Sequence, residues 1–204
     1  MKISLQNKKA LIGGSSKGLG FAVAEQLALS GAQVTIVSSN ERLLKERVLA
    51  LNKKTALKHN FLVCDYNDHE EYAKIMGNYL ENNTIDILVN NTQGPKAGDV
   101  NSLSIEDYQN AFDLLFKNIV LTTNLALKNM RNIQWGRIVN MSSIGGIYPN
   151  PKLTISYSET SNKVDPIPVA DPLGVTIAFT FKSFPVSVVS PIPSLEIPLT
   201  DKLE

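Results

Sequence analysis

The 204-residue sequence has few of the side chains that build disulfides and metal sites. It contains one cysteine, Cys64, and two histidines, His59 and His69. One thiol excludes an internal disulfide framework and a zinc site with several cysteine ligands, and neither histidine has a partner at metal-ligand spacing. We therefore expect no metal site, with Cys64 as a small core residue and both histidines at the surface. A lone thiol is also typical of a reducing compartment, which favours a cytoplasmic location.

The sequence also lacks an excess of charge and long hydrophobic runs. Twenty Lys and Arg residues stand against 19 Asp and Glu residues, which gives a net charge of +1. That balance argues against binding nucleic acid or an acidic membrane surface through bulk electrostatics. No stretch approaches about 18 unbroken apolar residues. We therefore expect no membrane span, and the apolar run before Gly13 is too short for a signal peptide.

Proline is nearly absent from the first three quarters of the chain, and glycine from the last quarter. Nine of the ten prolines lie between Pro149 and Pro198, whereas eleven of the twelve glycines lie at or before Gly146. Hydrophobic residues make up 43% of the chain, enough for a sizeable core. We expect a single domain over residues 1–204. Its first part should form regular strands and helices, whereas prolines should interrupt regular structure in the second.

The two parts are a regular core, residues 1–145, and a divergent proline-rich segment on the substrate side, residues 146–204. The Asp-Pro pairs that begin at Asp165 and Asp171 forbid a continuous helix in the second part. We expect the C-terminal part to be irregular or extended, with a strand or extended stretch over 175–181. A frame-shifted or truncated gene would produce this change of composition, and so would natural divergence.

Apolar strands alternate with amphipathic helices through the regular core. Short apolar and β-branched runs predict buried strands, and the segments between them carry helical spacing and helix caps. The expected strands are 10–12, 34–37, 61–63, 85–89 and 137–141, and the expected helices are 18–30, 40–51 with Asn40 as its cap, 68–81, and 104–131 opened by a capping box of Ser104 and Asp107. Continuously apolar strands joined by helical crossovers predict an α/β fold, a three-layer, doubly wound parallel sheet of the Rossmann-like type.

A glycine-rich turn joins the first expected strand to the first expected helix. The residues that we expect to bind the pyrophosphate of a dinucleotide are Gly14, Ser15, Ser16, Lys17, Gly18, Leu19 and Gly20. Glycines there let the backbone approach a phosphate, and the helix N-terminus offers free N–H groups and the positive end of its dipole. The alternative interpretation is a tight turn that serves only close packing of helix on strand.

With four downstream motifs, this turn resembles the short-chain dehydrogenase/reductase family. The motifs are Cys64-Asp65, Asn90-Asn91-Thr92-Gln93-Gly94, Trp135–Ser143, and Val186–Pro193, which is similar to the family's sixth strand and the turn after it. Asn91–Gly98 and Pro149-Asn150-Pro151 further resemble a branch of 3-oxoacyl-carrier-protein reductases. The resemblance implies a nicotinamide-dependent oxidoreductase, with Asp65 at the adenine and Asn90 among the cofactor-binding residues.

Charge at the end of the second strand favours NADP(H) over NAD(H). Sheets of this kind that bind NAD place an acidic residue there to bond the ribose 2′-hydroxyl. Here the strand is followed by Ser38, Ser39 and Asn40, and the first carboxylate is Glu41, inside the helix. We expect Lys17 to neutralise the 2′-phosphate while the three polar residues donate hydrogen bonds. The alternative for Lys17 is a solvated loop lysine.

The catalytic residues that the resemblance implies are incompletely present. Ser143 fits the serine that holds the substrate carbonyl, and Tyr157 is the best proton donor, although another register places Ser156 there. A tyrosine with a pKa near ~10 needs a neighbouring cation to work near neutral pH. The family's lysine lies four residues after the tyrosine, where this chain has Ser161. Lys163 is the available substitute only if the backbone there is not helical.

The family's asparagine, which holds a water, is displaced as well. Ungapped counting puts Leu115 at its position, and Asn118 and Asn124 would need a kink in the helix to reach the site. We interpret both asparagines as polar residues on a partly exposed helix. The resemblance also implies oligomers built through the fourth and fifth helices. Because prolines interrupt the fifth, any homo-oligomer is expected to be weak.

Two functions therefore stay open at the level of the sequence. The first is an NADP-dependent short-chain oxidoreductase that acts on a small carbonyl or secondary-alcohol substrate, with Ser143, Tyr157 and Lys163 as its catalytic residues. The second is a catalytically weak or inactive NADP(H)-binding domain that keeps the glycine loop. Position 161 separates them, because serine cannot supply the positive charge.

Overall fold

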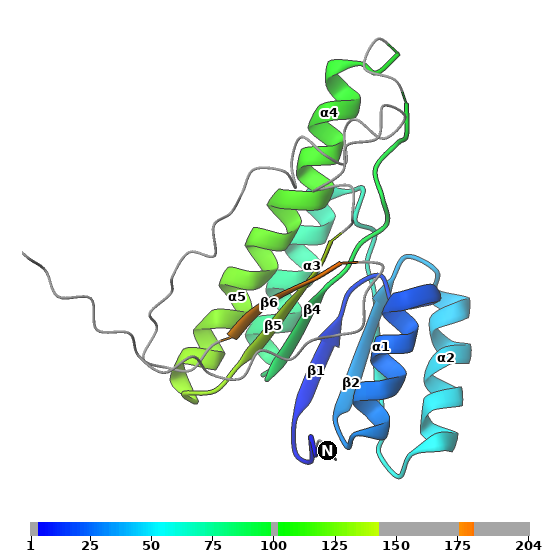
Figure 1. The fold of residues 1–204 in the computed structure, drawn as a ribbon, viewed down its shortest axis with the longest axis vertical. Coiled ribbons are helices and arrows are strands. Elements are labelled where there is room, and N and C mark those ends of the chain that lie inside the picture. Colours follow the sequence, from blue (N-terminus) through cyan, green and yellow to red (C-terminus); the bar gives the residue numbers. More distant parts are fainter. Residues whose placement is uncertain (1–3, 99–101, 143–175, 182–204) are drawn as a thin grey trace, which may run out of the picture.

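The computed structural model describes residues 4–98, 102–142 and, as backbone, 176–181. Strands and helices alternate along the chain (Figure 1). The strands are β1 (Lys9–Ile12), β2 (Gln33–Ser38), β3 (Asn60–Val63), β4 (Ile87–Asn90), β5 (Arg137–Ser142) and β6 (Thr176–Phe181). The helices are α1 (Gly18–Leu29), α2 (Glu41–Lys54), α3 (His69–Asn82), α4 (Ile105–Phe112) and α5 (Asn118–Asn132), with a π-helical turn, η1 (Asp113–Lys117), between the last two.

The six strands form one sheet in the order β3-β2-β1-β4-β5-β6, and every neighbouring pair is parallel. The order runs outward from β1 in both directions, so the chain is doubly wound and the carboxyl ends of all strands meet at one edge. The α/β fold and the parallel sheet expected from the sequence are therefore confirmed.

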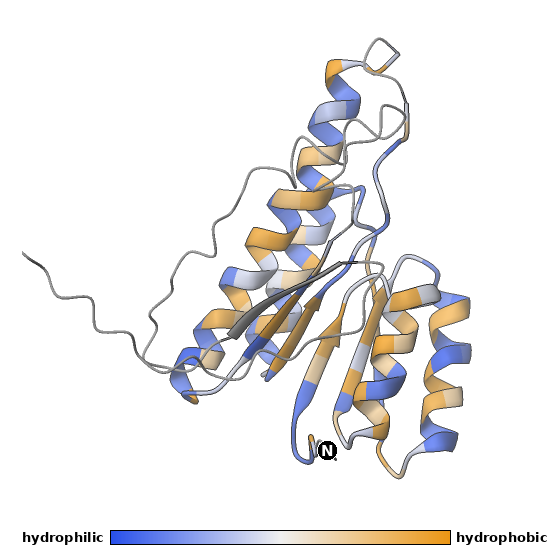
Figure 2. Ribbon diagram, in the orientation of Figure 1, coloured by the Kyte–Doolittle hydropathy of each residue, from blue (hydrophilic) through white to orange (hydrophobic). Residues whose placement is uncertain are grey.

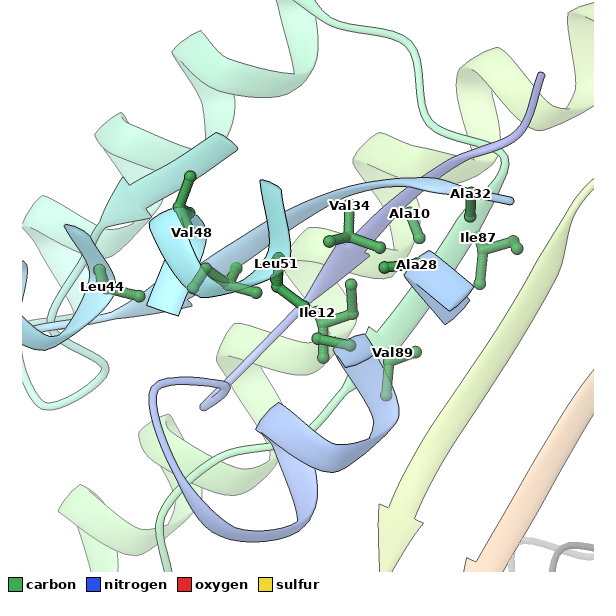
Figure 3. Packing of buried hydrophobic residues seen from close by; sticks show 12 residues of the cluster. Ala10, Ile12, Ala28, Ala32, Val34, Leu44, Val48, Leu51, Ile87 and Val89 are labelled. Atoms are coloured by element: carbon green, nitrogen blue, oxygen red, sulfur yellow. The ribbon is translucent and has the colours of Figure 1, made fainter. Parts of the chain in front are cut away.

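Alternate side chains of each central strand pack against different helices. Ala10 and Ile12 of β1 belong to the cluster under α1 and α2, whereas Leu11 between them packs with α3 and α5. Figure 3 shows the first cluster, in which Ile12 and Val34 of the sheet face Ala28 and Leu51 of the helices. Each such large side chain contributes roughly 1.5–3 kcal/mol when buried, so both faces of the sheet must be covered.

The hydropathy pattern follows from this layering. The central strands are hydrophobic along most of their length, whereas α2, α3 and α5 alternate between hydrophobic and hydrophilic residues (Figure 2). Cys64 is buried at the end of β3, as expected. His59 is also buried, which corrects the expected surface position. Its Nδ1 accepts the N–H of the distant Val34 at 3.1 Å, and its Nε2 lies 2.7 Å from the hydroxyl of nearby Thr55, so both ring nitrogens have partners in the interior.

One element differs from the sequence expectation, and one confirms it. The helix expected over 104–131 is interrupted by η1, and the capping box of Ser104 and Asp107 opens α4 as expected. The strand beside β5 is β6, within the stretch that the composition predicted to be extended. The stretch Val186–Pro193, which resembles the family's sixth strand and the turn after it, lies outside the described residues, so that assignment stays a prediction.

Candidate functional site

The carboxyl edge of the sheet gathers the loops in which the sequence placed the cofactor. Parallel pairing puts the turn after β1 next to the ends of β2 and β4, since Ile12 pairs with both Ile36 and Val89. Ligands of doubly wound sheets bind at this edge, where strand order reverses. The reversal here lies between β1 and β4, directly beside the glycine loop.

Ser15 attaches the glycine loop to two strands. Its hydroxyl donates to the Ile12 carbonyl at 2.6 Å and accepts the Val37 N–H at 2.9 Å, and its own N–H donates to the Val37 carbonyl at 3.0 Å. The residue is completely buried. These bonds fix the shape of the loop at Ser15, and the predicted role of this residue toward a cofactor stays a prediction.

Asn91 holds the same loop from the other side. Its Nδ2 donates to the carbonyls of Gly13 and Gly14, each at 3.1 Å. A Cβ on Gly14 would lie 2.7 Å from that nitrogen, and Gly14 also has a φ of +51°. Glycine is therefore required here by contact and by backbone conformation. The sequence singled out Asn90 instead, whose Nδ2 bonds Thr123 at 3.1 Å and Asn140 at 2.7 Å; its predicted role toward a cofactor stays a prediction.

Gly18 is different from the other loop glycines because it faces open space. Its φ is +58°, and a Cβ built on it would meet no atom within 4 Å. It is the first residue of α1, a 12-residue helix that has no side-chain cap and no acidic residue in its first turn. The positive end of the dipole of α1 therefore lies beside an uncrowded space at Gly18. An anion such as a pyrophosphate fits there.

Ser38, Ser39 and Asn40, at the end of β2, are polar and uncharged. Asn40 caps α2 through its Oδ1, which accepts the Leu43 N–H at 3.0 Å, and Ser38 accepts the Asn40 N–H at 3.3 Å. Glu41 is the nearest acid after β2, and it pairs with Lys45 at 2.6 Å. The uncharged polar groups expected from the sequence are therefore present, and the side-chain oxygen of Asn40 is occupied by the cap of α2.

Asp65 takes part in a series of side-chain hydrogen bonds that the sequence did not indicate. Its Oδ1 accepts from the backbone and side-chain nitrogens of Asn67 at 3.0 and 2.9 Å, and the Asn67 Oδ1 accepts the Gln93 Nε2 at 2.9 Å. Because β3 and β4 are not neighbours in the sheet, these hydrogen bonds link the loop after β3 to the loop after β4. Asp and Asn two residues apart signal a local turn, but nothing local indicates Gln93.

The loop after β4 has a second attachment near its far end. The Lys96 ammonium lies 3.0 Å from both carboxylate oxygens of Asp107. The Ser104 backbone N–H and the Lys96 ammonium hold the pKa of the Asp107 carboxyl below its usual range. The capping box of α4 thus also anchors the loop that begins at Asn91.

Asn118 is fully buried, which corrects the partly exposed position expected for it. Its Nδ2 donates to the Tyr66 carbonyl at 2.9 Å, and its Oδ1 lies 2.5 Å from the His69 Nδ1. The residue directly follows η1, and π-helical turns often occur at functional sites. Asn124 is exposed, as expected.

Two tyrosines fill the space between Asn118 and the glycine loop. The rings of Tyr66 and Tyr72 lie 4.9 Å apart, and the Tyr72 hydroxyl is 2.6 Å from that of Thr122. A Cβ on Gly13 would lie 2.5 Å from the Tyr66 hydroxyl. Burial raises the pKa of both tyrosines above the ordinary value, so both stay protonated at neutral pH.

The three predicted catalytic residues, Ser143, Tyr157 and Lys163, lie outside the described residues. β5, the last strand before them in the sequence, ends at Ser142. Within the described ranges, no group of three or more His, Cys, Asp and Glu side chains could hold a metal ion. No helix in this part of the chain is both long and apolar enough to cross a membrane.

Comparison with known proteins identifies relatives of this chain. The short chain dehydrogenase family model matches residues 8–160. A 3-oxoacyl-(acyl-carrier-protein) reductase of Chlamydia muridarum is 31% identical over 155 residues, 76% of this chain and 62% of that protein. A 7alpha-hydroxysteroid dehydrogenase of Clostridium sardiniense is 33% identical over 150 residues, 72% of this chain and 57% of that protein. The chain spans about three fifths of the length of these relatives.

Solved structures agree on the fold. L-Sorbose reductase from Gluconobacter frateurii, complexed with NADPH and L-sorbose, superposes with a TM-score of 0.73 at 25% identity, over 79% of this chain and 62% of that chain. A 3-oxoacyl (acyl-carrier-protein) reductase from Agrobacterium tumefaciens with NADP bound gives a TM-score of 0.72 at 23% identity, over 78% and 61%.

Proposed function

Because this chain belongs to the short-chain dehydrogenase family, we propose that it is an oxidoreductase that transfers a hydride between NADP(H) and a carbonyl or secondary-alcohol substrate. The observation that carries the proposal is the glycine loop. At the uncapped N-terminus of α1, a Cβ on Gly18 would meet no atom of the described residues within 4 Å, while Asn91 and Ser15 hold the rest of the loop in place. A loop of this kind is ready to receive a pyrophosphate without rearrangement.

The cofactor lies, in this proposal, along the carboxyl edge of the sheet. The backbone of Gly14–Gly20 holds the pyrophosphate, and Asp65 contacts the adenine. Asn90, behind the loop, fixes β4 to β5 through Asn140 and so supports the floor of the site. These assignments rest on the order of the loops along one edge, which is the order that a dinucleotide needs.

The preference for NADP(H) rests on charge. Lys17 is exposed, and no described residue pairs with it, while the only nearby acid at the start of α2 is neutralised by Lys45. Ser38, Ser39 and Asn40 add polar groups at the place expected for the 2′-phosphate. The NADPH and NADP in the two reductases named above support the same preference.

Bound nicotinamide would supply or accept the hydride, and residues of this chain would handle the oxygen and the proton. We assign Ser143 to hold the substrate oxygen by a hydrogen bond, and Tyr157 to exchange the proton with it. Lys163 is the cation assigned to lower the pKa of that tyrosine, since position 161 is a serine. The proposal requires that these three side chains lie beside the cofactor at the carboxyl edge of the sheet.

The test separates binding from turnover. NADPH binding is followed by its fluorescence, and NADPH consumption is measured with a panel of aldehydes and ketones, for the wild-type chain and for Tyr157→Phe. We expect binding by both proteins and turnover by the wild type alone. Binding without turnover by the wild type would make the chain a nucleotide-binding domain without catalysis, and absence of binding would refute the proposal.

A weak homo-oligomer is proposed through the exposed side of the helical segment α4–η1–α5. Phe112, Phe116 and Val120 follow each other at four-residue spacing and are 40, 47 and 40% exposed, and the two rings lie 5.1 Å apart. Apolar side chains at this spacing form one stripe on a helix. Sedimentation should show concentration-dependent association that Phe116→Ser abolishes; a wild-type monomer at all concentrations would refute it. The cytoplasmic location stays a prediction.

A further inference from the structure

Arg47 of α2 reaches the glycine loop, although its position in the sequence gives no sign of this. Its Nε donates to the Ser16 carbonyl at 3.1 Å, and its guanidinium lies 4.6 Å from the centre of the Phe21 ring. Long side chains on a helix lean toward its N-terminus, which here is the carboxyl edge of the sheet. The guanidinium of Arg47 is therefore carried from the second turn of α2 to the residue that precedes Lys17.

A second cation on the same face of α2 shows what is unusual about Arg47. Lys54 lies seven residues later, nearly two full turns on, and its Nζ pairs with Glu25 of α1 at 2.5 Å. Phe21, which faces Arg47, lies four residues before Glu25 on α1. Between α1 and α2, Lys54 thus contacts a carboxylate, whereas Arg47 contacts an aromatic ring.

The charge of Arg47 is left without a carboxylate in the part of the chain that the structure describes. Guanidinium has five N–H donors, and one of them is used by the Ser16 carbonyl. Glu41, at the start of the same helix, is already paired with Lys45. Lys17 follows Ser16 directly and is also unpaired among the described residues. Arg47 and Lys17 consequently bring two cations to the middle of the glycine loop, which the Ser15 N–H bond to the Val37 carbonyl holds beside the end of β2.

We propose that Arg47 is a specificity-determining residue that binds the adenosine 2′-phosphate together with Lys17. This inference rests on the proposed function, because it names a contact within the same cofactor site. The Ser16 bond and the Phe21 ring restrict the guanidinium to one orientation, so little side-chain entropy is lost when a phosphate arrives. A planar guanidinium with free N–H groups suits the oxygens of a phosphate monoester, and NADH offers no such group.

The test compares Arg47→Gln with the matched control Lys54→Gln. Both substitutions remove one positive charge from the same face of α2, but Lys54 is paired and lies farther from the loop. Dissociation constants for NADPH and NADH are measured by fluorescence for the full chain and both variants. We expect Arg47→Gln to weaken NADPH about 10- to 100-fold and NADH less than about threefold. Lys54→Gln should leave the ratio of the two constants unchanged.

Folding of the variant is checked by its circular dichroism and thermal midpoint. If Arg47→Gln does not fold, Arg47→Met replaces it, since a long unbranched apolar chain keeps the packing on Phe21. Equal weakening of both cofactors would overturn the assignment and show that Arg47 only supports the loop. Unchanged NADPH binding would overturn it as well. A wild-type chain that binds neither dinucleotide would refute the proposed function itself, which is a distinguishable result.

Discussion

Removal of the Asn91 side chain should damage the fold and the cofactor site by a predictable amount. Its amide makes two hydrogen bonds of 3.1 Å to loop carbonyls, at Gly13 and Gly14. At about 1 kcal/mol net for each bond, Asn91→Ala should lower the free energy of unfolding by about 2 kcal/mol. Because the loop would lose the contact that fixes its carbonyls, we also expect NADPH affinity to fall about tenfold.

Two further variants make the Asn91 experiment specific. Asn91→Asp keeps the size of the side chain but replaces both N–H donors with a carboxylate that faces two carbonyl oxygens, so its effect should exceed that of alanine. Asn83→Ala is the matched control, since that amide donates to the Tyr79 carbonyl at 2.9 Å on the exposed end of α3. It should change the free energy of unfolding by less than about 0.5 kcal/mol.

Urea titration and NADPH fluorescence are the two measurements. Wild-type stability and wild-type NADPH affinity in Asn91→Ala would refute the reasoning altogether. A loss of stability with unchanged affinity would show that Asn91 supports the fold but that the geometry of the loop does not determine binding.

Three other predictions concern the loop and the pH range of the fold. Gly18→Asn should fold, since asparagine tolerates a positive φ, but its side chain should fill the pyrophosphate space and reduce NADPH binding more than about 100-fold; unchanged affinity in the folded variant would place the pyrophosphate elsewhere. Lys17→Glu should weaken NADPH by about one to two decades and NADH much less, and an equal loss would contradict the 2′-phosphate contact. Burial, with a smaller effect from Asp65, raises the pKa of Cys64 from 9.0 to about 12, and burial lowers that of His59 from 6.5. The raised pKa of Cys64 stabilises the fold below pH 9, and this stabilisation is lost as pH rises toward 12. The lowered pKa of His59 stabilises the fold above pH 6.5, and this stabilisation is lost as pH falls. Urea midpoints should therefore be highest between pH 6.5 and 9, and Cys64→Ala should flatten the alkaline side of the profile and His59→Gln the acid side.

Much of the fold was predictable because short-range features determine it. The apolar runs of β1, β2 and β4, the Asn40 cap and the capping box of Ser104 and Asp107 all depend on residues within a few positions of each other. The glycine loop belongs to the same class, since a positive φ at Gly14 and Gly18 is a local requirement. From these features the parallel sheet, and the edge at which a cofactor is proposed to bind, follow by general rules of chain connection.

The partners of the site residues were decided only by the tertiary structure. Asn91 meets Gly13 across 78 positions, Ser15 meets Val37 across 22, Gln93 meets Asn67 across 26 and Arg47 meets Ser16 across 31. His59 and Asn118 were misplaced for the same reason, because a polar side chain gives no sign in the sequence of the distant group that makes its burial possible. Strand order brings such groups side by side, and it is set by packing on both faces of the sheet at once, whereas hydrophobic periodicity specifies only which side of each element is buried.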